Sequence, residues 1–223
     1  MPSDETHWLL VHGAFHAGWC WDRLLPHLTE RGIEASVVDL PFTSQADDWR
    51  TVEEAIDRLA QAGRRVVVVG HSHGGSVISG AGYRADHLVY LTALMTAPDD
   101  EFDLGGAPGM SAIVVDGDTA SIDPSQAAAA FYHRCDPADG EWATGRLRPM
   151  PIATLRADGE PEPAWRTVAS TYIVCDDDQI ITPAAQEQMA GHATAVRHID
   201  SDHSPFLACP AELASHLADI VGS

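Results

Sequence analysis

The chain has 223 residues, of which 45% are hydrophobic and 21% are charged, a composition typical of one globular domain with a sizeable core. Its 33 acidic residues outnumber 13 basic ones and give a formal net charge of -20, so we expect no nucleic acid partner and no anionic membrane surface. The chain contains no lysine, since all its basic residues are arginines, which excludes a Schiff-base lysine and a P-loop lysine.

The four cysteines are scattered along the chain, with no C-x-x-C pair and no spacing typical of a zinc site. Free thiols in a reducing compartment are the simplest interpretation. The first residues, MPSDETHW, have neither the basic segment nor the apolar stretch of a secretory signal, and no apolar run approaches ~18 residues. These features predict a cytoplasmic protein.

Apolar strand-like runs alternate with helical patterns along the chain. The expected strands cover residues 8–11, 33–40, 66–69, 88–91, 172–175 and 196–199, and the clearest helices cover 19–31, 49–62, 74–83 and 211–221. This alternation predicts an α/β fold in which a mostly parallel six-stranded sheet carries helices on both faces. The alternation stops between residues 97 and 168, which we interpret as a small helical cap inserted over the carboxyl edge of the sheet, within a single domain of residues 1–223.

A possible catalytic serine lies directly after the third expected strand. Four valines, residues 66–69, lead into Gly70-His71-Ser72-His73-Gly74 and then into a helix of small residues. A G-x-S-x-G sequence between a strand and a helix is typical of a sharp turn that holds the serine in a strained conformation with its hydroxyl exposed. Ser72 is therefore the candidate nucleophile. The backbone amide of His73, at the start of the helix, is a candidate donor to an oxyanion.

A nucleophilic serine needs a base and an acid, which in this class of fold follow in the order acid, then histidine. Asp176–Asp178 follow the fifth expected strand, and spacing alone leaves the choice among these three open. Of the 12 histidines, only His203 lies in the loop between the last strand and the last helix, so we expect it to be the base. A metal site using His71 and His73 is the weaker interpretation, because no third ligand has the usual spacing.

These features together resemble the α/β-hydrolase superfamily, and more narrowly the small methylesterase and hydroxynitrile lyase group with its bacterial relatives. The similar segments are LLVHGAFHAGWCWDRLLPHL at 9–28, VVDLP at 37–41, VVVVGHSHGG at 66–75, TYIVCDDDQII at 171–181, DSDHSPFLACPAEL at 200–213 and, more loosely, FYHRCDPADGEWATGRLRPMP at 131–151. The resemblance implies that Ser72, His203 and Asp178 form a catalytic triad. It also implies that the amides of Ala14 and His73 form an oxyanion hole.

The same resemblance bears on the reaction. Lyase members with this triad have a threonine where this chain has Gly13 and a lysine, which receives the leaving cyanide, where it has Ser204. We therefore expect a serine esterase that cleaves a small carboxylic ester through an acyl-enzyme, with no metal and no organic cofactor. The alternative is a non-hydrolytic lyase or cyclase, or a small-molecule-binding protein, that uses the same pocket, for example on a natural-product intermediate.

Candidate substrate contacts come from two segments. Gly13, Phe15 and Trp19 lie in or just after the oxyanion loop that the resemblance implies. Phe131 and Tyr132 lie in the expected cap, where an aromatic residue is more often part of the core than a ligand contact. The expected partner is a small ester substrate. A monomer and a homodimer both remain open.

Overall fold

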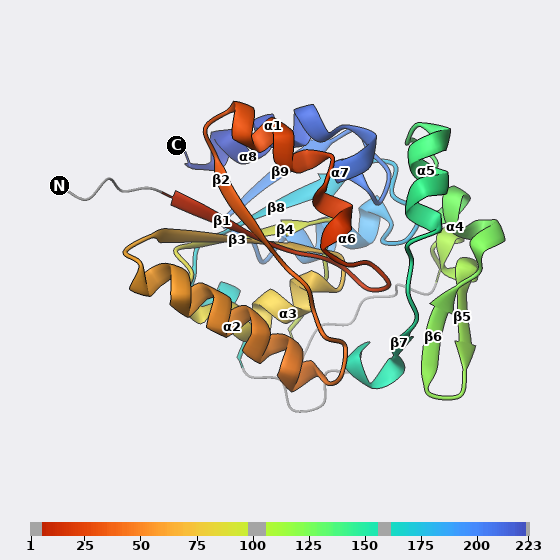
Figure 1. Cartoon of the computed structure of the whole chain (residues 1–223), viewed down its shortest axis with the longest axis horizontal. Coiled ribbons are helices and arrows are strands. Elements are labelled where there is room, and N and C mark those ends of the chain that lie inside the picture. Colours follow the sequence, from red (N-terminus) through yellow and green to blue (C-terminus); the bar gives the residue numbers. More distant parts are fainter. Residues whose placement is uncertain (1–5, 98–105, 156–161, 222–223) are drawn as a thin grey trace.

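The computed structural model describes residues 6–97, 106–155 and 162–221. Residues 1–5 and 222–223 of the expected domain, and residues 98–105 and 156–161 of the expected cap, lie outside the described residues. A parallel six-stranded sheet in the order β2-β1-β3-β4-β8-β9 forms the centre (Figure 1). Its strands are β1 Thr6–Val11, β2 Glu34–Val38, β3 Arg65–His71, β4 His87–Leu91, β8 Ser170–Cys175 and β9 Ala195–Ile199. The α/β class and the parallel six-stranded sheet are thus confirmed.

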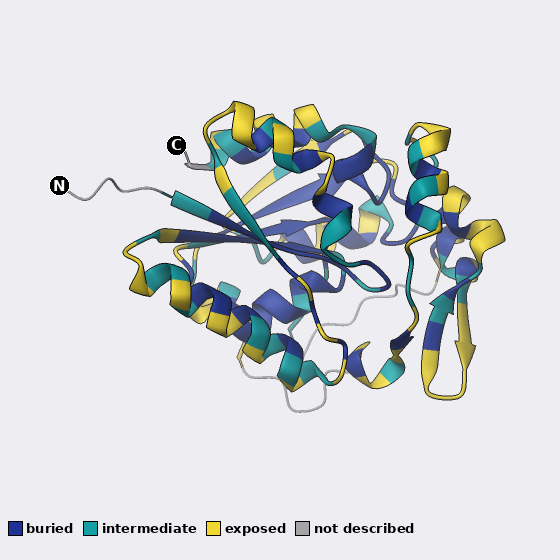
Figure 2. Ribbon diagram, in the orientation of Figure 1, coloured by how far each residue is buried: buried dark blue, intermediate teal, exposed yellow. Residues whose placement is uncertain are grey.

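The central strands are apolar because both of their faces are covered. In β3, every residue after Arg65 is buried, and all six residues of β8 are buried, as expected for inner strands of a parallel sheet. The edge strands β2 and β9 are mostly exposed or partly exposed, and their sequences EASVV and AVRHI are correspondingly more polar. Figure 2 shows this contrast as a buried centre between helices whose outer faces are exposed.

Helices cover both faces of the sheet. In Figure 1, α1 (Leu24–Glu30) and α8 (Pro210–Val221) lie on one side, and α2 (Gln45–Gln61) and α3 (Gly74–Ala81) lie on the other. Helix α2 begins at a cap, because Ser44 Oγ accepts a hydrogen bond from the amide of Asp47 at 3.1 Å. Two further helices, α6 (Pro183–Ala190) and the short α7 (Pro205–Ala208), follow β8 and β9. The 3-10 turns are η1 Gly18–Trp21, η2 Gly82–Arg84, η3 Pro108–Ala112, η4 Ile152–Leu155 and η5 Ala164–Arg166.

The segment between β4 and β8 contains a small sheet as well as helices, so the expectation of a helical cap was incomplete. Strands β5 (Ile113–Asp116), β6 (Thr119–Ile122) and β7 (Met150–Pro151) form an antiparallel sheet beside α4 (Pro124–Phe131) and α5 (Pro137–Thr144). The first two strands meet at a tight turn in which Gly117 has a φ of 56°, a conformation that favours glycine. This segment lies beside the carboxyl ends of the central strands (Figure 1).

Within the described residues, no helix is both long enough and apolar enough to span a bilayer.

Candidate active site

Ser72 occupies a strained turn between β3 and α3. Its φ is 52°, in the left-handed region that residues other than glycine rarely adopt. The turn is closed by hydrogen bonds from the amides of Gly75 and Leu94 to the carbonyl of Ser72, at 2.9 and 3.0 Å. A Cβ atom on Gly70 would lie 2.6 Å from the carbonyl oxygen of Gly74, so a side chain there would clash with the backbone. This geometry holds the serine at the carboxyl edge of the sheet.

His203 and Asp178 form a buried pair at the same edge. His203 Nδ1 donates a hydrogen bond to Asp178 Oδ2 at 2.6 Å, and both side chains are at most 1% exposed. The other two aspartates of the run point elsewhere, since Asp176 pairs with His198 and Asp177 with His133 and Arg134. Asp178 is therefore the member of the run that contacts His203. Its Oδ1 atom accepts hydrogen bonds from the amides of Ile180 and Ile181, at 2.6 and 3.0 Å.

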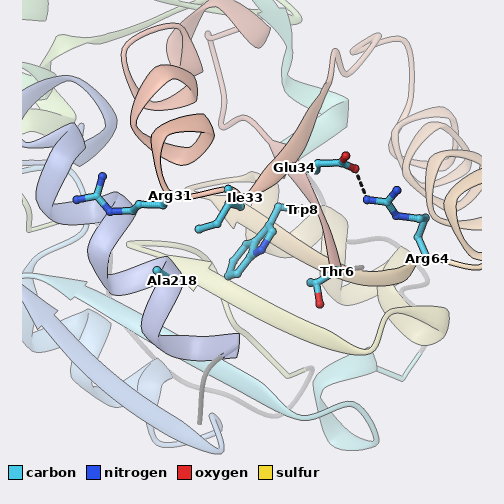
Figure 3. A pocket seen from close by; sticks show the side chains of 8 residues that line it. Thr6, Trp8, Arg31, Ile33, Glu34, Arg64 and Ala218 are labelled. Carbon is cyan, nitrogen blue, oxygen red and sulfur yellow. Dashed lines mark hydrogen bonds and ion pairs between the residues drawn. The ribbon is translucent and has the colours of Figure 1, made fainter. Parts of the chain in front are cut away.

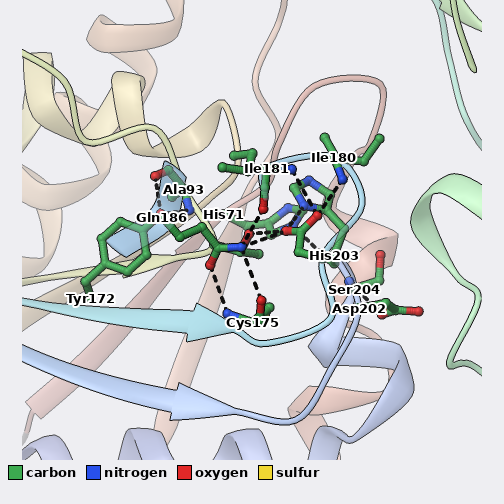
Figure 4. Close-up of polar contacts among 12 residues, drawn as sticks. His71, Ala93, Tyr172, Cys175, Ile180, Ile181, Gln186, Asp202, His203 and Ser204 are labelled. Atoms are coloured by element: carbon green, nitrogen blue, oxygen red, sulfur yellow. Dashed lines mark hydrogen bonds and ion pairs between the residues drawn. The ribbon is translucent and has the colours of Figure 1, made fainter. Parts of the chain in front are cut away.

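Two side chains that the sequence analysis missed also hold the Asp178 carboxylate. The hydroxyl of Thr92, just after β4, donates to Asp178 Oδ2, and Gln186 Nε2 on α6 lies 3.2 Å from the same oxygen. Gln186 also donates to the carbonyl of Ile181 at 2.7 Å and accepts from the amide of Cys175 at 2.9 Å (Figure 4). A carboxylate held by this many donors has a fixed orientation toward His203.

His71, which precedes the serine, connects the nucleophile turn to the His203 loop. Its Nε2 atom donates to the carbonyl of His203 at 2.8 Å, and the two rings lie 4.8 Å apart. Burial holds the pKa of His71 well below its usual value, so the ring is neutral. Among the described residues, the structure records no hydrogen bond between Ser72 and His203. In a ligand-free enzyme such a contact is often long and shortens when substrate binds.

The loop after β1 packs directly against Ser72. A Cβ atom on Gly13 would lie 2.7 Å from Ser72 Cβ, so a side chain at this position would require the loop or the serine to shift. Within the described parts of the chain, neither the Ala14 amide nor the His73 amide donates a recorded hydrogen bond. Both N–H groups are thus available for a ligand beside Ser72.

Two buried histidines hold this loop in place. His12 Nδ1 donates to the carbonyl of Gly13 at 2.9 Å and His12 Nε2 accepts from the amide of Leu40 at 3.0 Å. The Gly13 carbonyl and the Ala14 N–H belong to one planar peptide group, so fixing the carbonyl also fixes the N–H. His16 Nδ1 donates to the Ala14 carbonyl at 2.8 Å. Burial lowers the pKa of His12 to about 4 and that of His16 to about 3, which keeps both rings neutral.

A cavity of about 220 Å³ opens beside Ser72. Its wall is formed by Ala14, Phe15, Ser72, His73, Leu94, Met110, Ile113, Phe131, Leu155, Ile180 and Ile181. Of the expected substrate contacts, Phe15 and Phe131 are in this wall, but Gly13, Trp19 and Tyr132 are not. Trp19 instead stacks on His16 with ring centres 5.3 Å apart, and the Tyr132 hydroxyl donates to His16 Nε2 at 2.8 Å. These two aromatic residues contact His16 and so support the loop after β1.

A second pocket, of about 320 Å³, lies at the opposite, amino edge of the sheet (Figure 3). Its two arginines are at opposite ends and have partners, since Arg64 pairs with Glu34 and Arg31 donates to Ser215 Oγ at 2.9 Å. Its described lining residues include no histidine, and hence no histidine base beside a nucleophile. Across residues 6–97, 106–155 and 162–221, no group of three or more histidine, cysteine or acidic side chains is placed to hold a metal ion.

The sequence profile of the Alpha/beta hydrolase family matches residues 8–216. The chain belongs to the alpha/beta hydrolase family. It is 28% identical to methyl jasmonate esterase 1 of Vitis vinifera, over 100% of this chain and 99% of that protein. It is 27% identical to the pyrethroid hydrolase of Sphingobium wenxiniae, over 96% of this chain and 87% of that protein.

A solved structure of a hydrolase is also similar to this chain. The crystal structure of a pyrethroid hydrolase from Sphingobium faniae superposes on this alpha/beta hydrolase with a TM-score of 0.82 and 25% identity, covering 98% of each chain. The expectation of a carboxylic ester hydrolase is confirmed, since the relatives are esterases and hydrolases.

Proposed function

We propose that this alpha/beta hydrolase cleaves a small, mainly apolar carboxylic ester through an acyl-enzyme on Ser72. The observation that carries the proposal is the buried hydrogen bond from His203 Nδ1 to Asp178 Oδ2, 2.6 Å long, at the same sheet edge as a serine with a φ of 52°. This combination is the one that a serine nucleophile needs, namely an exposed hydroxyl, a base, and an acid that orients the base.

Acylation begins when Ser72 attacks the ester carbonyl carbon. Because the Nδ1 proton of His203 is directed to Asp178, the lone pair on Nε2 takes the proton from the serine hydroxyl. A bond forms between Ser72 Oγ and the carbonyl carbon, and the carbonyl oxygen becomes an oxyanion that accepts hydrogen bonds from the amides of Ala14 and His73. The C–O bond to the alcohol then breaks, and the alcohol leaves with the proton from His203.

Deacylation repeats these steps with water. His203 takes a proton from a water molecule, which attacks the acyl carbon, and the same two amides stabilise the second oxyanion. Collapse of this intermediate breaks the bond to Ser72 Oγ, which recovers its proton from His203. The carboxylic acid leaves and the free enzyme is restored without a metal or an organic cofactor.

The volume and the wall of the cavity favour substrates that are small and uncharged. Its volume of about 220 Å³ is below the ~300 Å³ at which pockets for drug-sized ligands begin. Of the eleven described residues in its wall, nine are apolar, and the net charge of -20 repels anions. We therefore propose short, uncharged esters as substrates.

The test is hydrolysis of p-nitrophenyl acetate and butyrate by wild type, Ser72→Ala, His203→Ala and Asp178→Asn. Loss of the serine or the base should lower kcat by on the order of 10⁶-fold, and Asp178→Asn by ~10⁴-fold, because the amide favours the wrong tautomer of His203. The control is His216→Gln on α8, which should retain wild-type kcat. A folded wild type that hydrolyses neither ester contradicts the proposal and favours the non-hydrolytic or binding alternative.

A further inference from the structure

Among the described residues that line the Ser72 cavity, His73 is the one, apart from the serine itself, whose side chain is polar. Its imidazole is only 3% exposed, and Nε2 has no hydrogen-bond partner among the described residues. Burial lowers the pKa of His73 to about 4, so the ring is neutral at ordinary pH. A neutral imidazole has one N–H donor and one bare nitrogen acceptor.

The other histidines around the oxyanion loop differ from His73 in their hydrogen bonds. His12 uses both ring nitrogens, one to the Gly13 carbonyl and one to the Leu40 amide. His16 also uses both, to the Ala14 carbonyl and the Tyr132 hydroxyl. His71 retains an unpaired Nδ1, but its ring is not part of the cavity wall. His73 thus combines an unpaired buried nitrogen with a position in the wall.

Buried polar groups in folded proteins are nearly always hydrogen-bonded, and an exception calls for an explanation. A leucine or methionine at this position would complete an apolar wall without leaving a nitrogen unpaired. A substrate oxygen that bonds to the imidazole would supply the missing partner. Ser72 and His73 line the same cavity, so an ester bound beside Ser72 shares that cavity with His73.

We propose that His73 determines specificity by hydrogen bonding to a hydroxyl or keto oxygen of the substrate, so that the preferred substrates are short esters oxygenated near the ester group. This inference rests on the proposed function, because it concerns the ester held beside Ser72. A hydroxyl group suits either tautomer of the ring, since it can donate and accept. The preference is therefore for a neutral oxygenated ester over its hydrocarbon analogue.

The test uses two pairs of esters in which a hydroxyl replaces a methyl group of similar size. On the acyl side, p-nitrophenyl 3-hydroxybutyrate is compared with p-nitrophenyl 3-methylbutyrate. On the alcohol side, 2-hydroxypropyl butyrate is compared with 2-methylpropyl butyrate. The ratio of kcat/KM within each pair is measured for wild type, His73→Phe, His73→Gln and the control Ile113→Val. Dividing the wild-type ratio by the variant ratio cancels the intrinsic reactivity of the esters.

In at least one pair, the ratio of hydroxylated to methylated ester should be ~10-fold higher in wild type than in His73→Phe. His73→Gln, which retains a polar atom near the position of Nε2, should recover part of the difference. Ile113→Val alters the same wall without removing a nitrogen and should keep the wild-type ratio. If His73→Phe does not fold, the wild-type ratio of kcat/KM is compared instead with the ratio in His73→Gln. It is also compared with the ratio of the rates at which hydroxide hydrolyses the same two esters.

Equal ratios in wild type and His73→Phe for both pairs, with all four esters hydrolysed, would overturn the role of His73 and leave the esterase intact. A ratio of hydroxylated to methylated ester that is lower in wild type than in His73→Phe for both pairs would do the same. If wild type hydrolyses none of the four esters and a fluorophosphonate does not label Ser72, the proposed function itself fails. The two failures are therefore distinguishable.

Discussion

The substitution His12→Phe tests how the oxyanion loop is held. Phenylalanine keeps an aromatic ring but removes both nitrogens, so the Gly13 carbonyl and the Leu40 amide lose the hydrogen bonds that the structure records at 2.9 and 3.0 Å. Each buried backbone group left without a partner costs ~1–3 kcal/mol. We expect the free energy of unfolding to fall by about 2–6 kcal/mol, measured by urea denaturation.

The same substitution should also slow catalysis. The Gly13 carbonyl shares its peptide plane with the Ala14 N–H, so freeing the carbonyl lets the oxyanion donor rotate out of position. Loss of one such donor costs ~3 kcal/mol of transition-state stabilisation, or about 100-fold in kcat. The assay is steady-state hydrolysis of p-nitrophenyl butyrate in buffer without urea, where the folded fraction is known from the denaturation curve.

The outcome that refutes this reasoning is a folded His12→Phe enzyme with kcat within ~3-fold of wild type. It would mean that the Ala14 amide keeps its direction without His12, or that it does not contact the oxyanion. His216→Gln, on α8 away from the cavity, controls for the general effect of replacing a histidine. It should change neither kcat nor the urea midpoint by a measurable amount.

Three further predictions concern the groups around the triad. Thr92→Val removes the hydroxyl that donates to Asp178 and should lower kcat for p-nitrophenyl butyrate ~10-fold, whereas Thr92→Ser should stay near wild type. Arg134→Ala removes exposed ion pairs to two aspartates and should lower the free energy of unfolding in urea by no more than ~1 kcal/mol. Stability should decline as the pH falls from about 6.5 toward 4, because burial lowers the pKa of His12 and His73 to about 4 and that of His16 to about 3, so the unfolded chain binds more protons in this range. Asp48, whose pKa burial raises to about 6, and Asp202, whose pKa burial also raises, have the opposite effect. They are outnumbered, because burial also lowers the pKa of His7, His71 and His87. A Tm at pH 5 equal to or above that at pH 7 would contradict the prediction.

The sheet was predictable because its inner strands are buried on both faces and so form uninterrupted apolar runs. Residues 66–69 are all valine and all fully buried in β3. The small sheet of the cap was not predicted, because Val114 and Val115 in β5 are exposed and their strands are only four residues long. Strand β6 buries only Ala120 and Ile122, so neither four-residue strand has a periodicity long enough to distinguish it from a loop.

Ser72 and His203 were predictable from their places directly after a strand and in the last loop, whereas position left the acid open among Asp176–Asp178 and only the family resemblance selected Asp178. The side chains that support Asp178 were not predictable, since they depend on contacts between distant parts of the chain. Thr92 and Asp178 are 86 positions apart in the sequence, and nothing in the residues around Thr92 indicates this contact. Gln186 carried a weak signal, as a glutamine on a short helix after the acid, but its burial emerges only from the packing of α6 against β8.

The most direct test of the central claim is covalent labelling with a fluorophosphonate, followed by peptide mass mapping, on wild type, Ser72→Ala and His203→Ala. The account predicts that the label is found on Ser72 alone, that Ser72→Ala is not labelled, and that His203→Ala is labelled far more slowly. A label on another residue, or no label on a folded wild type that hydrolyses p-nitrophenyl butyrate, would contradict the assignment of Ser72 as the nucleophile.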